Sequence, residues 1–130
     1  MDQPSEKPLL DKLGVKGGFR VSVLGMEEPG FVEDLRRRGA SVAVGRAIRD
    51  SDLIFVYVAH RDELDHAIAP LEASLKRNGA IWVIRPKGSP DIKEVDVIDA
   101  GLRAGLVDNK IASFSDSLSA MRLVIPVARR

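Results

Sequence analysis

Two groups of cationic residues follow hydrophobic segments and are candidates for binding an anion. His60 and Arg61 come just after the hydrophobic run at 53–58, and a basic segment follows the run at 80–84. If both runs are parallel strands, their carboxyl ends meet at one edge of the sheet, where ligand crevices form. Arginine can bind a carboxylate or phosphate through two hydrogen bonds, and lysine through a point charge. We therefore expect a site for a small anionic ligand that includes His60, Arg61, Arg85, Lys87, Gly88 and Ser89.

The loop G-M-E-E-P-G at 25–30 follows the first hydrophobic segment and is expected to complete the same crevice. Gly25, Glu27 and Gly30 are its candidate site residues. The glycines lack the G-x-G-x-x-G spacing that holds a dinucleotide pyrophosphate, and Glu27 and Glu28 would repel phosphate. The alternative is that Gly25 and Gly30 only shape a turn.

Several catalytic chemistries lack the residues that they need. The chain has no cysteine, which excludes thiolate nucleophiles, disulfides and cysteine-based metal sites. His60 and His66 are six residues apart, and metal-binding histidine pairs on a helix are four apart. No serine lies in a G-x-S-x-G motif. We expect no metal site and assign no catalytic residue.

Composition and charge indicate one globular domain without a strongly charged partner. The 130 residues are 45% hydrophobic and 30% charged, and the net charge of +1 gives no field that favours nucleic acid or a membrane surface. The basic run at 36–38 suits the end of a helix. Acidic residues and prolines at the N-terminus do not resemble a secretory signal. We expect a cytoplasmic protein with a flexible tail at 1–7 and a single domain at 8–130.

The order of predicted elements is that of an α/β protein. Hydrophobic patterns predict strands at 19–24, 41–44, 53–58 and 80–84, and a hairpin of strands at 106–114 and 121–127. Short helices are expected near Leu9–Leu13 and from Pro29 to about Gly39. A helix at 64–75 should be kinked by Pro70 and stopped by Asn78-Gly79. Asp91 and Glu94 should cap a helix whose inner face is Val95, Ile98 and Leu102.

These elements predict a three-layer Rossmann-like sandwich with a mostly parallel sheet and an antiparallel C-terminal strand pair. The link at 45–52 is too short for a normal crossover helix, so the strands at 41–44 and 53–58 are not adjacent, or the unit between them is trimmed. Trp82 is expected in the core. Arg122 is expected to pair with Asp116 or with a partner subunit, since the terminal hairpin edge can support a homodimer.

This order of elements resembles the class I methyltransferase-like Rossmann fold. The segment S-L-K-R-N-G-A-I-W-V-I at 74–84 is similar to the pattern that precedes the fifth strand of that fold. On this mapping, one strand and its helix are missing after Val44. The resemblance implies S-adenosylmethionine as cofactor, a glycine-rich first loop and an acid at the end of the second strand. That strand ends instead at Gly45-Arg46.

A closer resemblance, over most of the chain, is to a family of short bacterial proteins described as a domain of unknown function. It rests on G-x-φ-W-V-φ-x-P-K (φ, apolar) at 79–87, A-G-L at 104–106 and S-x-x-R-L-V-x-P at 119–126. The resemblance supports the fold and leaves the function open. Our main interpretation is a noncatalytic, methyltransferase-like domain without a cofactor that binds a small anionic ligand or a protein partner. The alternative is an enzyme, a divergent S-adenosylmethionine-dependent small-molecule methyltransferase.

Overall fold

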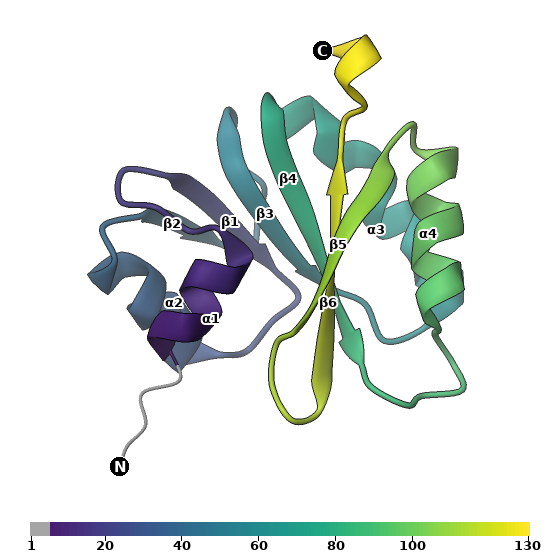
Figure 1. The fold of residues 1–130 in the computed structure, drawn as a ribbon, viewed down its shortest axis with the longest axis horizontal. Coiled ribbons are helices and arrows are strands. Elements are labelled where there is room, and N and C mark those ends of the chain that lie inside the picture. Colours follow the sequence, from purple (N-terminus) through teal and green to yellow (C-terminus); the bar gives the residue numbers. More distant parts are fainter. Residues whose placement is uncertain (1–5) are drawn as a thin grey trace.

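A six-stranded sheet forms the centre of the computed structural model, which describes residues 6–130 (Figure 1). The strand order is β2-β1-β3-β4-β6-β5. Strands β1 to β4 are parallel, and β6 is antiparallel to both of its neighbours. This confirms the predicted fold class. The strands are β1 (Arg20–Leu24), β2 (Ser41–Val44), β3 (Ser51–Tyr57), β4 (Leu75–Pro86), β5 (Val107–Ser113) and β6 (Leu118–Val124).

Helices cover both faces of the sheet and make the three layers (Figure 1). Helices α1 (Glu6–Leu13) and α2 (Pro29–Arg37) pack on one face. The other face carries the short helix η1 (Arg61–Glu63), α3 (Leu64–Ile68), η2 (Ala69–Ser74) and α4 (Glu94–Arg103). A last short helix, η3 (Val127–Arg129), follows β6. Residues 1–5 of the predicted N-terminal tail lie outside the described residues.

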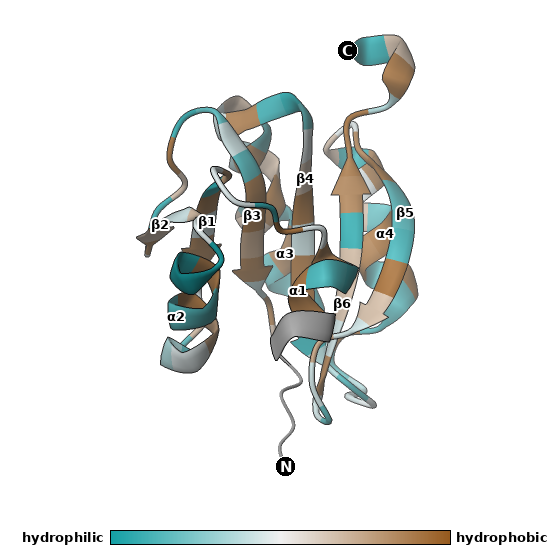
Figure 2. Ribbon diagram, turned by 60° about the vertical axis from the view of Figure 1, so that its left-hand side comes forward, coloured by the Kyte–Doolittle hydropathy of each residue, from teal (hydrophilic) through white to brown (hydrophobic). Residues whose placement is uncertain are grey.

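The central strands are hydrophobic because both of their faces are buried, as Figure 2 shows for β3 and β4. Successive side chains enter opposite cores: Phe55 and Trp82 pack under α1 and α2, whereas Ile54 and Ile81 pack under α3 and α4. Trp82 is fully buried, as expected, and its Nε1 donates a hydrogen bond to the carbonyl oxygen of Leu13 at 3.1 Å. This bond ties the end of α1 to the centre of the sheet.

A pair of buried serines holds the short link between β2 and β3. Strand β1 lies between these two strands, so the first of the two sequence alternatives is correct. The hydroxyls of Ser22 and Ser51 are 2.8 Å apart. The Ser22 hydroxyl accepts a bond from the Ile48 N–H, and the Ser51 hydroxyl donates to the Ile48 carbonyl. The two hydroxyls therefore satisfy the backbone N–H and carbonyl of Ile48 in a link that has no helix.

The helix expected at 64–75 was wrong in its extent. It is broken into α3 and η2, with Pro70 in the first turn of η2, and Leu75 already belongs to β4. Asn78 and Gly79 lie inside that strand rather than ending a helix. A side chain at Gly79 would lie 2.8 Å from the Asp52 carbonyl oxygen, so glycine here permits close approach of β3 and β4.

The predicted inner face of α4 was wrong for two of its three residues, and Ile98 packs against the core as expected. Val95 and Leu102 are 55% and 57% exposed, and the buried residues are Val97, Ala100 and Gly101. A Cβ at Gly101 would lie only 3.1 Å from a methyl group of Leu123, so small residues let the helix approach the sheet closely. The predicted Asp91–Glu94 cap is replaced by a bond from the Lys93 N–H to the Asp96 carboxylate.

Candidate functional site

Gly25 shapes the point where β1 leaves the sheet. Its φ of +72° lies in the left-handed region, and a Cβ on it would lie 3.1 Å from the Tyr57 carbonyl oxygen at the end of β3. After β1 the chain enters α2 on one face of the sheet, and after β3 it enters η1 and α3 on the other. Such a divergence between neighbouring parallel strands is where ligands bind in open α/β sheets.

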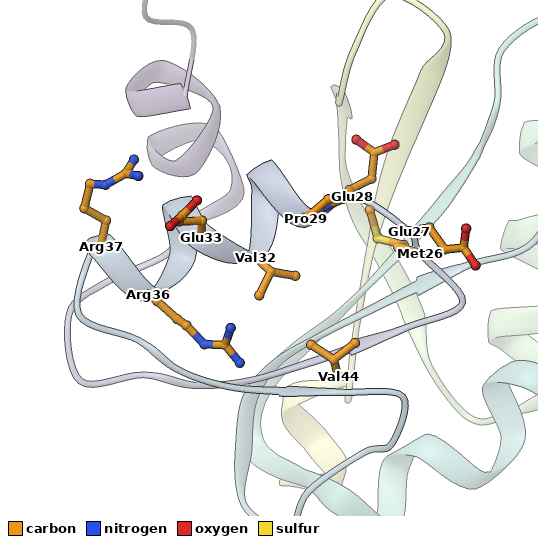
Figure 3. A pocket seen from close by; sticks show the side chains of 9 residues that line it. All are labelled: Met26, Glu27, Glu28, Pro29, Val32, Glu33, Arg36, Arg37 and Val44. Carbon is orange, nitrogen blue, oxygen red and sulfur yellow. The ribbon is translucent and has the colours of Figure 1, made fainter.

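Two adjoining hollows open at this edge, and we refer to them together as the rim trough. The smaller hollow, of about 420 Å³, lies over the ends of β1, β3 and the start of β6. The larger, of about 740 Å³, lies between α2 and the end of β2 (Figure 3). Both have the size of small-molecule sites. Met26, Glu27 and Glu28 line both; the smaller adds Gly25, Tyr57, Ser117 and Leu118, and the larger adds Pro29, Val32, Glu33, Arg36, Arg37 and Val44.

The middle of the rim trough is acidic, because Glu27 and Glu28 line both hollows, whereas Arg36 and Arg37 line only the larger one. Arg36 donates to the Val42 carbonyl at 3.3 Å, and Arg37 pairs with Asp34 at 3.0 Å. Among the residues that the structure describes, Glu27 and Glu28 take part in no ion pair. Val32 and Val44 face each other across the larger hollow (Figure 3). A cationic group with an adjoining flat apolar part would match this lining.

His60 and Arg61 lie outside the rim trough. The Arg61 guanidinium donates to the carbonyl oxygens of Pro90 at 2.7 Å and of Asp91 at 3.3 Å. It lines a separate hollow of about 230 Å³ beside α3 and α4. His60 Nδ1 lies 3.6 Å from an Asp91 carboxylate oxygen. These contacts direct both side chains toward the loop before α4.

The predicted residues at the end of β4 lie beside the rim trough without lining it. The Lys87 N–H donates to the carbonyl of Ser117, which lines the smaller hollow, but its ammonium donates to the Ser113 hydroxyl at 2.7 Å. Arg85 contacts the carbonyl of Pro86, its neighbour in the chain. Gly88 occupies a turn with φ of +68°, and the Ser89 hydroxyl accepts a bond from the Asp91 N–H.

Of the nine predicted site residues, Gly25 and Glu27 line the rim trough, and Gly30 lies in the first turn of α2 beside it. Sequence reasoning missed Val32, Val44, Tyr57 and Leu118 as lining residues. Val44 and Tyr57 are the last residues of β2 and β3, so strand ends were the signal that could have found them. Over the described part of the chain, no cluster of three metal-ligating side chains occurs, and no helix has the length and apolarity to cross a bilayer.

The strand order, with parallel strands followed by an antiparallel pair, defines a shortened class I methyltransferase fold, and known structures agree. An S-adenosylmethionine-dependent methyltransferase from Aquifex aeolicus superposes with a TM-score of 0.69 and 15% identity, over 95% of each chain. Magnesium protoporphyrin IX methyltransferase from Synechocystis PCC 6803, with bound S-adenosylmethionine, gives 0.69 and 13%, over 93% of this chain and 76% of that one.

A TehB-like methyltransferase from Corynebacterium glutamicum gives a TM-score of 0.61 at 15% identity, over 96% of this chain and 89% of that one. At these identities the likeness establishes the fold alone. No protein-family model matches the sequence, and no curated protein is similar to it.

Proposed function

We propose that this chain binds S-adenosylmethionine in the rim trough and uses it to methylate a small molecule. The observation that carries the proposal is the acidic, partly apolar trough at the switch point of a fold shared with S-adenosylmethionine-dependent methyltransferases. This favours the alternative that the sequence left open over a noncatalytic anion-binding domain. The proposed location is the cytoplasm.

The smaller hollow fits the methionine end of that cofactor. Glu27 and Glu28 supply carboxylates for a cationic amino group and sulfonium, and Gly25 allows a ligand to approach the backbone closely. Leu118 and Met26 add apolar walls. When bound, the cofactor supplies an electrophilic methyl group on its sulfonium. The role of these residues is to hold and orient it.

The larger hollow fits an adenosine group only in part. Val32 and Val44 offer apolar surface for a flat base (Figure 3). Strand β2, however, ends in Val44, and Gly45-Arg46 follow without a carboxylate for the ribose. Helix α2 brings Glu33 and Arg36 to this hollow as polar side chains for the ribose hydroxyls. We therefore expect a weaker hold on the ribose than on the methionine end.

Calorimetry with S-adenosylmethionine and S-adenosylhomocysteine tests the proposal. We expect micromolar binding and a preference for S-adenosylmethionine, because only that molecule carries the sulfonium charge. Replacing Glu27 and Glu28 with glutamine should reduce the preference several-fold, since a charge pair near the surface contributes about 1 kcal/mol. Glu94→Gln, an exposed change on α4, is the control.

The outcomes separate the two functions. Absence of binding at millimolar cofactor would refute the proposal. Binding without turnover, measured as S-adenosylhomocysteine release across a panel of small-molecule acceptors, would instead support a noncatalytic binding domain.

A further inference from the structure

Arg122 is a partly buried cation without an acidic partner. It lies in β6 opposite Trp82 of β4 and Lys110 of β5, on the sheet face that α1 covers. The predicted pairing with Asp116 does not occur: over the described part of the chain, its one side-chain hydrogen bond goes to Asn109 Oδ1 at 3.2 Å. A guanidinium has five donors, so most of them remain for a ligand or water. Burial lowers the pKa of Arg122, and the charge of Arg130 lowers it further.

A β-bulge brings two more donors to this arginine. The register of β5 shifts between Asp108 and Lys110, so Asn109 is an extra residue in the strand. Asp108 pairs with Leu123, which belongs to the core on the opposite face of the sheet. The bulge therefore places Asn109 and Lys110 next to Arg122 and leaves the nearby acid on the other side. Bulges commonly redirect side chains next to functional sites.

These residues line a hollow of about 270 Å³ with an excess of positive charge. Its other walls come from the end of α1: Asp11, Lys12, Leu13 and Gly14. The Asp11 carboxylate is engaged by Arg38 at 3.0 Å, and the Lys110 ammonium donates to the Lys12 carbonyl at 2.7 Å. Because Asn109 Oδ1 accepts from Arg122, its amide nitrogen remains as a donor.

The geometry points to a second ligand site, in which Arg122, Asn109 and Lys110 bind a phosphate-type dianion. Charge-assisted bonds from a guanidinium and an ammonium suit such a group. The hollow is lined by three cationic residues, Arg122, Lys110 and Lys12, and by one acid, Asp11, which is already paired with Arg38. The site is distinct from the rim trough, because Arg122 is four residues along β6 from Leu118, or about 13 Å. It does not depend on the proposed cofactor.

The single tryptophan provides a probe for this site. Trp82 is the only tryptophan, and its indole N–H bonds to Leu13, which lines the hollow. Inorganic phosphate is titrated into the full chain at constant ionic strength while the indole N–H resonance is followed by NMR. We expect a saturable shift, and a weaker response to acetate because a monoanion gains less from the three cations.

Substitutions assign the site. Arg122→Gln should weaken phosphate binding at least about tenfold, because a hydrogen bond to a charged group contributes that much. Lys110→Gln, an exposed change, should also weaken it and serves as the test if Arg122→Gln does not fold. Arg49→Gln removes an exposed arginine outside the hollow and should leave the affinity unchanged.

Three results would overturn the inference. One is a shift that does not saturate, which indicates only nonspecific screening. Another is equal affinity for acetate and phosphate, and the third is equal loss in Arg49→Gln and the two site variants. The first would mean that Arg122 and Lys110 only neutralise the carbonyl end of α1.

Discussion

Two glycines of the first loop carry different constraints, although both were candidate site residues on sequence grounds. Gly25 has a left-handed backbone and meets the Tyr57 carbonyl, so its lack of a side chain is required. Gly30 lies in α2, and a Cβ there would find no atom within 4 Å. Of the two glycines, only Gly25 is therefore required by its backbone and its close contact, and it lines the smaller hollow.

Alanine at these two positions makes a matched pair. Gly25→Ala should lower the free energy of unfolding by about 1–3 kcal/mol, because it adds backbone strain and a close contact with Tyr57. Gly30→Ala should be neutral or stabilising by up to about 1 kcal/mol, as alanine suits a helix better than glycine. Urea unfolding of both variants measures the difference. Equal effects would contradict the role of Gly25.

Among the elements, the link between β2 and β3 is unusual because it crosses β1 without a helix. A buried hydroxyl pair holds this link, because it satisfies the backbone N–H and carbonyl of Ile48. Both serines are fully buried, so a lost partner cannot be replaced by bulk water. We infer that this pair fixes the path of the short link beside β1.

Single and double alanine variants test that inference. Ser22→Ala and Ser51→Ala should each cost about 1–3 kcal/mol of stability, since each leaves a buried polar group unpaired. The double variant should cost less than the sum, because both partners are then removed together. Ser41→Ala, at the exposed start of β2, is the control. Additive losses in a double-mutant cycle would show that the two hydroxyls act independently.

At the scale of the whole molecule, two hydrophobic cores share one sheet. Every central strand contributes alternate residues to both cores, so loss of either helical layer would expose one hydrophobic face of the sheet. The edge strands β2 and β5 each pair with one neighbour. A homodimer through the β5 edge stays a prediction, which light scattering across protein concentration tests.

Shared packing predicts unfolding in a single step. Trp82 reports on the α1 side of the sheet, whereas far-UV circular dichroism reports on all helices and strands. We expect the urea midpoints from tryptophan fluorescence and circular dichroism to coincide, as for most single domains of this size. A fluorescence transition at lower urea would show that the α1 layer unfolds separately.

Local sequence patterns were sufficient to predict those strands whose ends are marked by residues within the same segment. Strand β2 was predicted with its observed ends, and β1 and β3 to within two residues at each end. The clearest signal was that of β3, because a strand buried on both faces contains a continuous hydrophobic run. The prediction failed in part for α4, where hydrophobic spacing favoured Val95 and Leu102, but the helix approaches Leu123 of the sheet through Gly101. Of the first loop, Gly25 and Glu27 line the smaller hollow.

The sequence by itself determined the order of elements and the fold class, because these follow from hydrophobic runs and turn residues close together in the chain. Only the tertiary structure decided which residues meet there. Arg61 and Lys87 are held by partners 26 or more residues away, and a strand register joins Arg122 to Asn109 and Lys110. Such contacts depend on how distant segments pack, and no local pattern records them.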